Sequence, residues 1–386
     1  MSAVYFDNNA TTPLDPRVAE AMIPWLTAHH GNPSSIHSFG RAAREAVEEA
    51  RAAVAELLGA RPVEVVFTGS GTEANNAVLA AIGAAAGHHG HVVLSAFEHP
   101  SVRAAVEELE RRGMEATRIA PGPDGVVSAA AIEQALRPDT RLVCLMLANN
   151  EVGTLQPVAE VAGFCRARGI PVSTDAVQAA GKVALDVAEL GVDYLTIGAH
   201  KFHGPLGAAA LWVRPGAVYG SLLVGGSQER RRRAGTENVA AIVGLGRIAE
   251  LVRRELPERC AKLLALRDHF EAGLASFPDT VVHCQGSPRL PHTSHAAFLG
   301  LEAESLLIRL DLAGFAVSTG SACSAGVVEP SKTLLAMGLS PREALSSLRI
   351  SFGMMNELAE VDAFLAALAR ERAALARVAP LTRSAA

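Results

Sequence analysis

Residues 65–74 read Val-Val-Phe-Thr-Gly-Ser-Gly-Thr-Glu-Ala, a short apolar run that breaks into a glycine turn and then opens a helix. The same alternation of apolar runs and helical patterns extends from about residue 60 to residue 225. The apolar runs predict strands at Val63–Phe67, His91–Ser95, Ala116–Ile119, Leu142–Leu147, Ile170–Ser173, Tyr194–Ile197 and Ala208–Val213. The intervening patterns predict helices at Glu73–Ala86, Ser101–Arg112, Ala129–Leu136 and Val158–Arg168. Strand–helix alternation of this kind predicts an α/β fold with a mainly parallel sheet.

The length of the chain predicts two domains. Its 386 residues exceed the roughly 250–300 at which a single hydrophobic core stops growing. A long helical pattern at Ala240–Arg267 leads out of the α/β region, and the remainder has fewer strands. We therefore expect a large domain at residues 13–260, and a smaller α+β domain made of residues 1–12 and 261–386.

Composition excludes several classes of protein. Hydrophobic residues make up 49% and the formal net charge is -5, so a nucleic-acid partner is not expected. No apolar run approaches the roughly 20 residues that span a bilayer, and the first residues lack the pattern of a secretory signal. We therefore expect a cytoplasmic protein without a membrane partner. The five cysteines are widely spaced, which argues against a disulfide framework or a zinc site.

The glycine turn after the first predicted strand is suited to hold an anion. Backbone N–H groups at a helix N-terminus, together with the hydroxyls of Ser70 and Thr72, can cradle a phosphate. The run also satisfies the loose dinucleotide fingerprint, with Glu98 as a candidate ribose-binding acid. A tight turn with a hydroxyl cap is the third interpretation.

Further polar residues follow other predicted strands. Asn149, Asn150 and Asp175 stand where two apolar strands stop, and Asp175 could instead cap the following helix. Lys201 directly follows a strand, between His200 and His203. A desolvated lysine there could form a Schiff base, whereas an exposed loop lysine would not.

Together these residues predict a pyridoxal-phosphate site. A phosphate cradle, an Asp that keeps the ring nitrogen protonated and a Lys that binds the aldehyde are its requirements. His99, just past another strand end, is the candidate for the ring face. A nicotinamide oxidoreductase would use the glycine turn but would leave Asp175 and Lys201 without a role.

Cys323 lies in a segment of small residues, Val317-Ser-Thr-Gly-Ser-Ala-Cys-Ser-Ala-Gly. Most cysteines are buried in cores, but this neighbourhood is not apolar. An accessible cysteine in such a segment is suited to nucleophilic attack and to persulfide chemistry.

The chain resembles the cysteine desulfurases of the nitrogen-fixation and housekeeping iron–sulfur type, within the class-V aminotransferase family. The motifs that carry the resemblance are Asp7-Asn-Asn-Ala-Thr-Thr, Gly31-Asn-Pro-Ser-Ser-Ile-His, Gly69-Ser-Gly-Thr-Glu-Ala-Asn, Glu98-His-Pro, Asn149-Asn-Glu-Val-Gly-Thr, Asp175-Ala-Val-Gln, His200-Lys, Gly225-Gly-Ser-Gln-Glu-Arg, Arg233-Ala-Gly-Thr-Glu-Asn, Gly320-Ser-Ala-Cys and Arg349-Ile-Ser-Phe. They run nearly from end to end of the chain.

The resemblance implies pyridoxal-phosphate fold type I, with a seven-stranded sheet, and a homodimer with the active site at the subunit interface. It assigns catalysis to Cys323, Lys201 and His99. It assigns cofactor binding to Gly71, Thr72, His99, Asn150, Asp175, Gln178, Gly198, His200, Lys201 and, across the dimer, Thr236. Substrate binding falls to Asn150 and Arg349, whose guanidinium suits a carboxylate. Position 198, often a phosphate-binding Ser in the family, is Gly here, so any contact there is through the backbone.

The implied reaction removes sulfur from L-cysteine, giving L-alanine and a persulfide on Cys323, which passes to a sulfur acceptor or cluster-scaffold protein. The sequence leaves the acceptor, the pathway, and the preference for sulfur over selenium open. It also leaves open whether Cys323 transiently ligates an iron–sulfur cluster. A selenocysteine lyase or a transaminase would share the cofactor site, although a transaminase has no use for Cys323. A non-catalytic scaffold would leave the strand-end residues unexplained.

Overall fold

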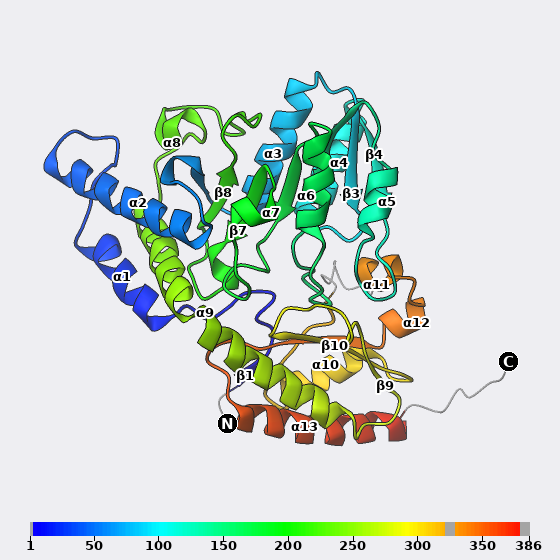
Figure 1. Cartoon of the computed structure of the whole chain (residues 1–386). Helices are drawn as coiled ribbons and strands as arrows, with labels where there is room; N and C mark the ends of the chain where they lie inside the picture. Colours follow the sequence, from blue (N-terminus) through cyan, green and yellow to red (C-terminus); the bar gives the residue numbers. More distant parts are fainter. Residues whose placement is uncertain (1–2, 321–328, 379–386) are drawn as a thin grey trace.

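The computed structural model, which describes residues 3–320 and 329–378, is built on a seven-stranded sheet (Figure 1). The strand order is β2-β8-β7-β6-β5-β3-β4. β8 is antiparallel to both of its neighbours, and the pairs that join β3 to β7 are parallel. The strands are Val65–Thr68 (β2), His91–Ser95 (β3), Glu115–Ile119 (β4), Thr140–Cys144 (β5), Val172–Asp175 (β6), Tyr194–Gly198 (β7) and Ala209–Val213 (β8). The predicted mainly parallel sheet is confirmed.

Helices cover both faces of this sheet because successive strand residues point to opposite sides. Val66 and Val92 pack with α3 and α4, whereas their neighbours Phe67 and Val93 belong to the core formed with α2, α6 and α9. The helices of this part are Pro16–Thr27 (α1), Ser38–Leu57 (α2), Gly71–Ala85 (α3), Pro100–Arg111 (α4), Ala129–Gln134 (α5), Val158–Ala167 (α6), Val187–Leu190 (α7), Gln228–Arg231 (α8) and Val239–Leu274 (α9).

A second group of elements lies below the central sheet in Figure 1. It contains an antiparallel sheet of order β12-β10-β9 and the parallel pair β1-β11. Its core gathers the rings of Phe6, Phe270, Phe352 and Phe364. The elements are Val4–Tyr5 (β1), Thr280–Val282 (β9), Thr293–Phe298 (β10), Ala303–Leu312 (α10), Phe315–Ala316 (β11), Lys332–Ala336 (α11), Pro341–Ala344 (α12), Ser347–Ser351 (β12) and Leu358–Val378 (α13). The predicted domain boundaries stay a prediction.

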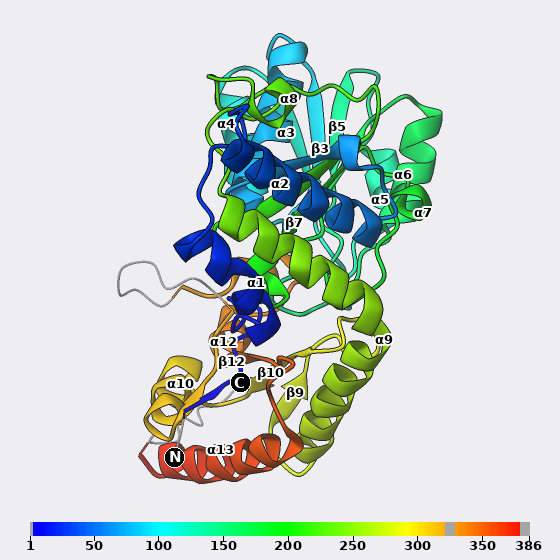
Figure 2. The same ribbon diagram turned by 90° about the vertical axis from the view of Figure 1, so that its left-hand side faces the viewer.

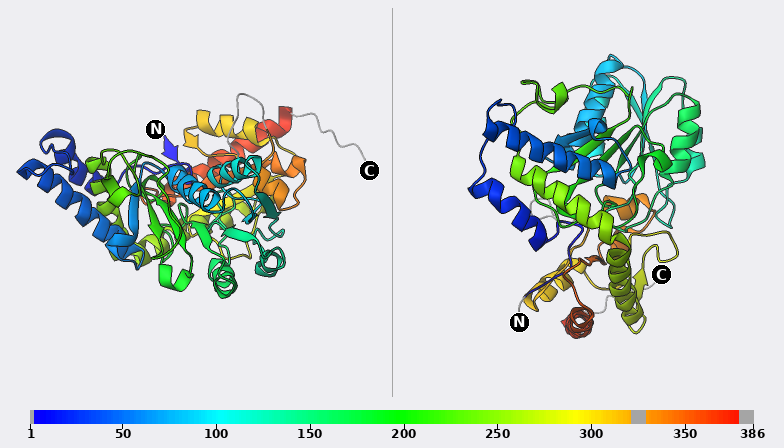
Figure 3. Two further views of the ribbon diagram at one scale, coloured as in Figure 1. Left: turned by 90° about the horizontal axis from the view of Figure 1, so that it is seen from above. Right: turned by 60° about the vertical axis from the view of Figure 1, so that its left-hand side comes forward.

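Helix α9 joins the two groups. It is 36 residues long and includes Pro257, which has no N–H to donate to the helical ladder. Its first half lies beside α2, and its second half continues down to α13 (Figures 2 and 3). The helix predicted at Ala240–Arg267 is therefore correct but seven residues too short at its C-terminal end.

The N-terminal segment also contacts both groups. β1 pairs with β11, and Asp7 forms a bridge with Ser351. Farther on, the Thr12 N–H donates to the carbonyl of His200, next to Lys201. Residues 7–12 of this segment, most of them polar, therefore connect the sheet of β12, β10 and β9 with the seven-stranded sheet. Within the described residues, no helix has both the length and the apolar character needed to cross a membrane.

Candidate active site

A cavity of about 390 Å³ opens at the carboxyl ends of the parallel strands, where ligands bind in open α/β sheets. Its lining also includes polar residues to which the sequence had given no role, namely Asp7, Asn9 and Ser101. The predicted residues that it brings together are Gly71, Thr72, His99, Asn150, Asp175, Gln178, His200, Lys201 and Arg349.

Lys201 follows β7 in a single 3-10 turn, which directs its side chain back toward the N-terminal segment. Its Nζ donates to the carbonyl oxygens of Asn9 and Ala10, each at 2.7 Å. Burial and, after it, the charge of nearby Arg349 lower the pKa of Lys201 to about 8, against the opposing effect of Asp175. The amine is therefore close to its neutral, nucleophilic form at mildly alkaline pH.

Asp175 is the last residue of β6, and both of its oxygens accept hydrogen bonds. Oδ1 accepts from the N–H of Val177 at 3.0 Å, which is the local capping interaction that the sequence allowed. Oδ2 accepts from Nδ2 of Asn75 at 2.7 Å. The carboxylate is therefore fixed in orientation at the edge of the cavity.

His99 caps the N-terminus of α4, and its ring lines the cavity. Nδ1 accepts the backbone N–H of Ser101 at 3.1 Å and lies 2.8 Å from Oγ of the same residue. Burial lowers the pKa of His99, and the charges of Lys201 and Arg103 act in the same direction, against Asp175. The imidazole is therefore favoured in its neutral form.

The turn between β2 and α3, which the sequence predicted as an anion cradle, lines the cavity with Ser70, Gly71 and Thr72. Ser70 caps α3 by accepting the N–H of Glu73 at 3.1 Å. A Cβ at Gly71 would lie 2.8 Å from Cγ2 of Val177, so only glycine fits where the first helical N–H groups face the cavity. The N-terminal end of this 15-residue helix favours negative charge.

Arg349, which belongs to β12, also lines the cavity. Its Nη2 lies 2.6 Å from Oδ1 of Asp7, and its Nη1 donates to the carbonyl of Asn150 at 2.9 Å. Nε is buried and has no hydrogen-bond partner among the described residues. The guanidinium is thus held in place with donor capacity left for an anionic ligand.

These groups fit pyridoxal phosphate. Gln178 donates from Nε2 to the carbonyl of Asn9 at 2.9 Å, while its buried Oε1 has no partner among the described residues and could accept a ligand hydroxyl. A carboxylate, a lysine with a lowered pKa and a helix N-terminus face the same cavity. These three groups match, in turn, the ring nitrogen, the aldehyde and the phosphate of that cofactor.

Two of the predicted residues, Gly198 and Thr236, are described but do not line the cavity, and a third falls outside the described residues. Gly198 ends β7 as a buried strand residue, with Val177 beside the position of a Cβ. Thr236 is exposed, in the segment between α8 and α9. Cys323 lies outside the described residues, although Ser318 and Gly320, which precede it, line the cavity.

Glu98 does not have the geometry of a ribose-binding acid. It is 2% exposed, and its Oε1 accepts from Oγ of Ser95 at 2.6 Å and from the N–H of Met146 at 2.7 Å. Burial raises the pKa of Glu98 to about 7. The dinucleotide interpretation of the glycine turn therefore loses its second residue.

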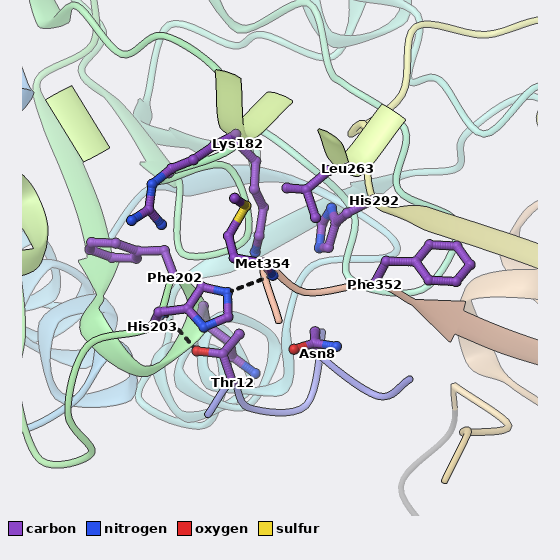
Figure 4. Close-up of a pocket in the computed structure, with 12 residues that line it drawn as sticks. Asn8, Thr12, Lys182, Phe202, His203, Leu263, His292, Phe352 and Met354 are labelled. Atoms are coloured by element: carbon purple, nitrogen blue, oxygen red, sulfur yellow. Dashed lines mark hydrogen bonds between the residues drawn. The ribbon is translucent and has the colours of Figure 1, made fainter. Parts of the chain in front are cut away.

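A second, smaller cavity of about 10 Å³ is lined in part by Lys201 and has room for about one water molecule. Figure 4 shows Lys182 extending into it beside Met354 and His292. His203 is part of its wall: Nδ1 donates to the carbonyl of Pro13 at 2.8 Å, and Nε2 accepts the N–H of Met354. His203, which flanks Lys201 in sequence, is therefore a structural residue in a fully bonded neutral form.

Comparison with known proteins confirms the family that the motifs indicated. The model of the aminotransferase class-V family matches residues 4–364. The cysteine desulfurase IscS of Methanosarcina thermophila is 42% identical over 98% of this chain and 94% of its own length. The cysteine desulfurase of Bradyrhizobium diazoefficiens is 44% identical over 93% of this chain and 92% of its own.

Solved structures agree with this assignment. A NifS-like protein superposes with a TM-score of 0.91 at 35% identity, covering 97% of this chain and 100% of that protein. SspA in complex with cysteine gives a TM-score of 0.80 at 34% identity over 90% of this chain and 98% of that one. Because the family match spans nearly the whole chain and the cavity holds the donors that the cofactor requires, this chain belongs to the class-V aminotransferases, as a pyridoxal-phosphate-dependent enzyme whose relatives are cysteine desulfurases.

Proposed function

We propose that this chain is a cysteine desulfurase that transfers the sulfur of L-cysteine to Cys323 and releases L-alanine. The observation that carries the proposal is the shared cavity of Lys201 and Asp175, in a chain whose relatives are desulfurases. The exchange balances: the carbon–sulfur bond of cysteine breaks, a sulfur–sulfur bond to Cys323 forms, and the proton of the Cys323 thiol replaces the sulfur on carbon.

The cofactor would be held by residues of the central sheet. Gly71, Thr72 and His200 would bind its phosphate, with the backbone of Gly198 close behind. Asp175 would face the ring nitrogen, Gln178 the ring hydroxyl, and His99 the ring face. When bound, pyridoxal phosphate supplies an electron sink that makes the α-proton of an amino acid removable.

The chain's own residues would bind the substrate and move its protons. Arg349 would bind the carboxylate of L-cysteine, with Asn150 beside it, and would exchange part of its interaction with Asp7 for that contact. The amine of Lys201, with its pKa of about 8, can take up the α-proton at Nζ. His99 lines the same cavity and would shuttle protons there.

We further propose a homodimer in which Thr236 completes the phosphate site of the partner subunit. Thr236 is exposed, and the segment before it carries exposed apolar side chains, including Val224 at 93% exposure and the neighbouring Leu222 and Leu223. Apolar side chains grouped on a surface favour a protein partner. Burying this segment against a second copy would bring Thr236 to that copy's cavity.

The persulfide would then pass to a sulfur acceptor or a scaffold protein for iron–sulfur cluster or other thio-cofactor assembly. Such chemistry needs a compartment that keeps thiols reduced, and we expect the cytoplasm. We also propose that residues 13–260, and residues 1–12 with 261–386, act as two domains. Their separate hydrophobic clusters support this division.

The proposal is tested by measuring alanine release from L-cysteine in wild type, Cys323→Ala and Cys284→Ala. Cys284 is a matched control because it is partly exposed but outside the cavity, and burial raises its pKa to about 11. We expect Cys323→Ala to lose about a hundredfold or more of the activity and Cys284→Ala to keep it. Equal rates in all three proteins would remove Cys323 from the reaction. An unchanged absorbance spectrum of the holoenzyme on adding L-cysteine would remove the function itself.

A further inference from the structure

Asn75, on the inner side of α3, links two groups of the cavity that come from different strands. Its Nδ2 donates to Oδ2 of Asp175 at 2.7 Å and to Oγ of Ser101 at 3.0 Å. Ser101 in turn contacts Nδ1 of His99 through both its hydroxyl and its backbone N–H. A continuous series of hydrogen bonds therefore runs from Asp175 to His99.

The direction of each bond follows from the donors and acceptors available. A backbone N–H can only donate, so Nδ1 of His99, which receives it from Ser101, carries a lone pair. The hydroxyl of Ser101 must then donate to the same nitrogen. Its oxygen is left free to accept from Asn75, which is the bond that the structure contains.

The amide of Asn75 has two N–H groups, and both are used, one toward Asp175 and one toward Ser101. Asn75 is 3% exposed and Ser101 is 6% exposed, so water has little access to replace either bond. A buried series in which each hydrogen bond fixes the direction of the next is stiff, because reversing one member leaves another unpaired.

We propose that Asn75 is a positioning residue that orients Asp175 and, through Ser101, holds the proton of His99 on Nε2. This inference rests on the proposed function for its consequence. A proton shuttle at His99 needs its proton at one defined nitrogen, and Asp175 needs a fixed orientation toward the cofactor ring. Asn75 contributes to both with one amide, because it orients the Ser101 hydroxyl that adds to the backbone N–H at Nδ1, although it does not line the cavity itself.

The neighbouring Asn76 provides a matched control. It is the same residue type on the same helix, and its Nδ2 donates to the carbonyls of Thr72, at 2.9 Å, and of Ser101, at 3.1 Å. It therefore contacts Ser101 without entering the series that ends at His99. Loss of Asn76 reports the general cost of removing an asparagine from α3.

The test is histidine-side-chain ¹⁵N NMR on the cofactor-free protein, with the His99 signals assigned by their absence from His99→Gln. In wild type we expect a single neutral form, with Nε2 protonated and Nδ1 accepting hydrogen bonds. Asn75→Ala should move the Nδ1 resonance toward that of a weaker hydrogen bond, while Asn76→Ala leaves it in place. In a Ser101→Ala background, Asn75→Ala should have no further effect, because the connection is already broken.

A proton on Nδ1 in wild type would overturn the proposal without any variant, and so the test survives if Asn75→Ala fails to fold. Equal resonances in Asn75→Ala and Asn76→Ala would also overturn it. In the holoenzyme, Asn75→Ala should lower kcat for L-cysteine about tenfold or more with little change in KM. If wild type releases no alanine, the proposed function fails while the NMR result stands on its own.

Discussion

Lys201 illustrates how a few surrounding charges set the reactivity of one side chain. An ordinary lysine with a pKa of about 10.4 is almost entirely charged at neutral pH. Burial and, after it, the positive charge of Arg349 bring the pKa of Lys201 to about 8, although Asp175 and Asp7 each act to raise it. Asp7 also pairs with Arg349 at 2.6 Å, so it moderates the influence of that guanidinium on the amine.

Asp7→Asn is therefore expected to lower the pKa of Lys201 further, because it removes one of the two carboxylates that raise it. Reductive methylation reacts with neutral amines, so the pH dependence of labelling at Lys201 in the cofactor-free protein reports this pKa. Mass spectrometry would follow it, with Lys262 as the internal reference. Asp268→Asn, which removes an exposed carboxylate on α9, should leave the midpoint unchanged. A labelling midpoint for Lys201 that is unchanged or higher in Asp7→Asn would contradict this account.

The sequence predicted those site residues that stand directly at strand ends. Lys201 and Asp175 each follow an apolar run, and a charged residue there is conspicuous. Asp7, Asn75 and Ser101 were given no role, because nothing in their local pattern shows which distant groups they contact. Asp7 meets Arg349 only because the N-terminal segment runs beside β12, where Asp7 bridges Ser351. Asn75 looks like any polar residue on an amphipathic helix.

At the scale of elements, the segment around α8 is held in an unusual conformation. Glu229, Arg230 and Arg231 all have positive φ, at 47°, 58° and 64°, which disfavours side chains other than glycine. Glu229 offsets this cost by a buried, bidentate pair with Arg51 of α2, at 2.7 Å for each contact, and by accepting the N–H of Phe67. The pair fixes the segment that leads to Thr236.

Glu229→Gln is expected to destabilise the protein by about 3–5 kcal/mol, because it leaves the buried Arg51 charge without its partner. Urea unfolding at neutral pH would measure the loss. Glu48→Gln removes the other carboxylate that contacts Arg51, but Glu48 is 45% exposed, so its loss should cost less than about 1 kcal/mol. Similar losses for both variants would show that burial does not distinguish the two pairs.

Element boundaries were the least predictable part of the fold. β6 was predicted at Ile170–Ser173 but occupies Val172–Asp175. The N–H of Ile170 still belongs to the turn that ends α6, since it donates to the carbonyl of Cys165. Polar Thr174 continues the strand because its hydroxyl donates to the carbonyl of Leu145. Apolar patterning locates a strand, but such tertiary bonds decide where it ends.

At the scale of the whole molecule, the junction between the two groups of elements contains a buried amine. Lys182, 4% exposed, extends into the small cavity of Figure 4, and its Nζ has no hydrogen-bond partner among the described residues. Burial lowers the pKa of Lys182 well below its ordinary value, and the charge of Lys201 adds to this. His203, His292 and Arg259 also line the cavity and do not supply a negative charge.

Because the amine of Lys182 is buried without a partner among the described residues, we expect the free energy of unfolding to depend on pH. With its pKa lowered in the folded state, Lys182 is neutral when folded and protonated when unfolded, so the unfolded state binds more protons and stability rises with pH. The effect covers the range from the folded pKa up to about 10.4, where the unfolded lysine also loses its proton.

Lys182→Met should remove this dependence and should stabilise the protein at pH 7, because a buried apolar chain replaces an unpaired polar group. Its advantage over wild type should shrink by about 1.4 kcal/mol per pH unit as pH rises toward 10, within the range where one proton is linked to unfolding. Urea unfolding of both proteins at several pH values measures this difference, in which titrations common to both cancel. Lys262→Met removes an exposed lysine paired with Glu357 and should leave the pH dependence unchanged. If Lys182→Met is less stable than wild type at pH 7, or runs parallel to it across pH, then Lys182 is charged in the folded protein and has a partner in that cavity.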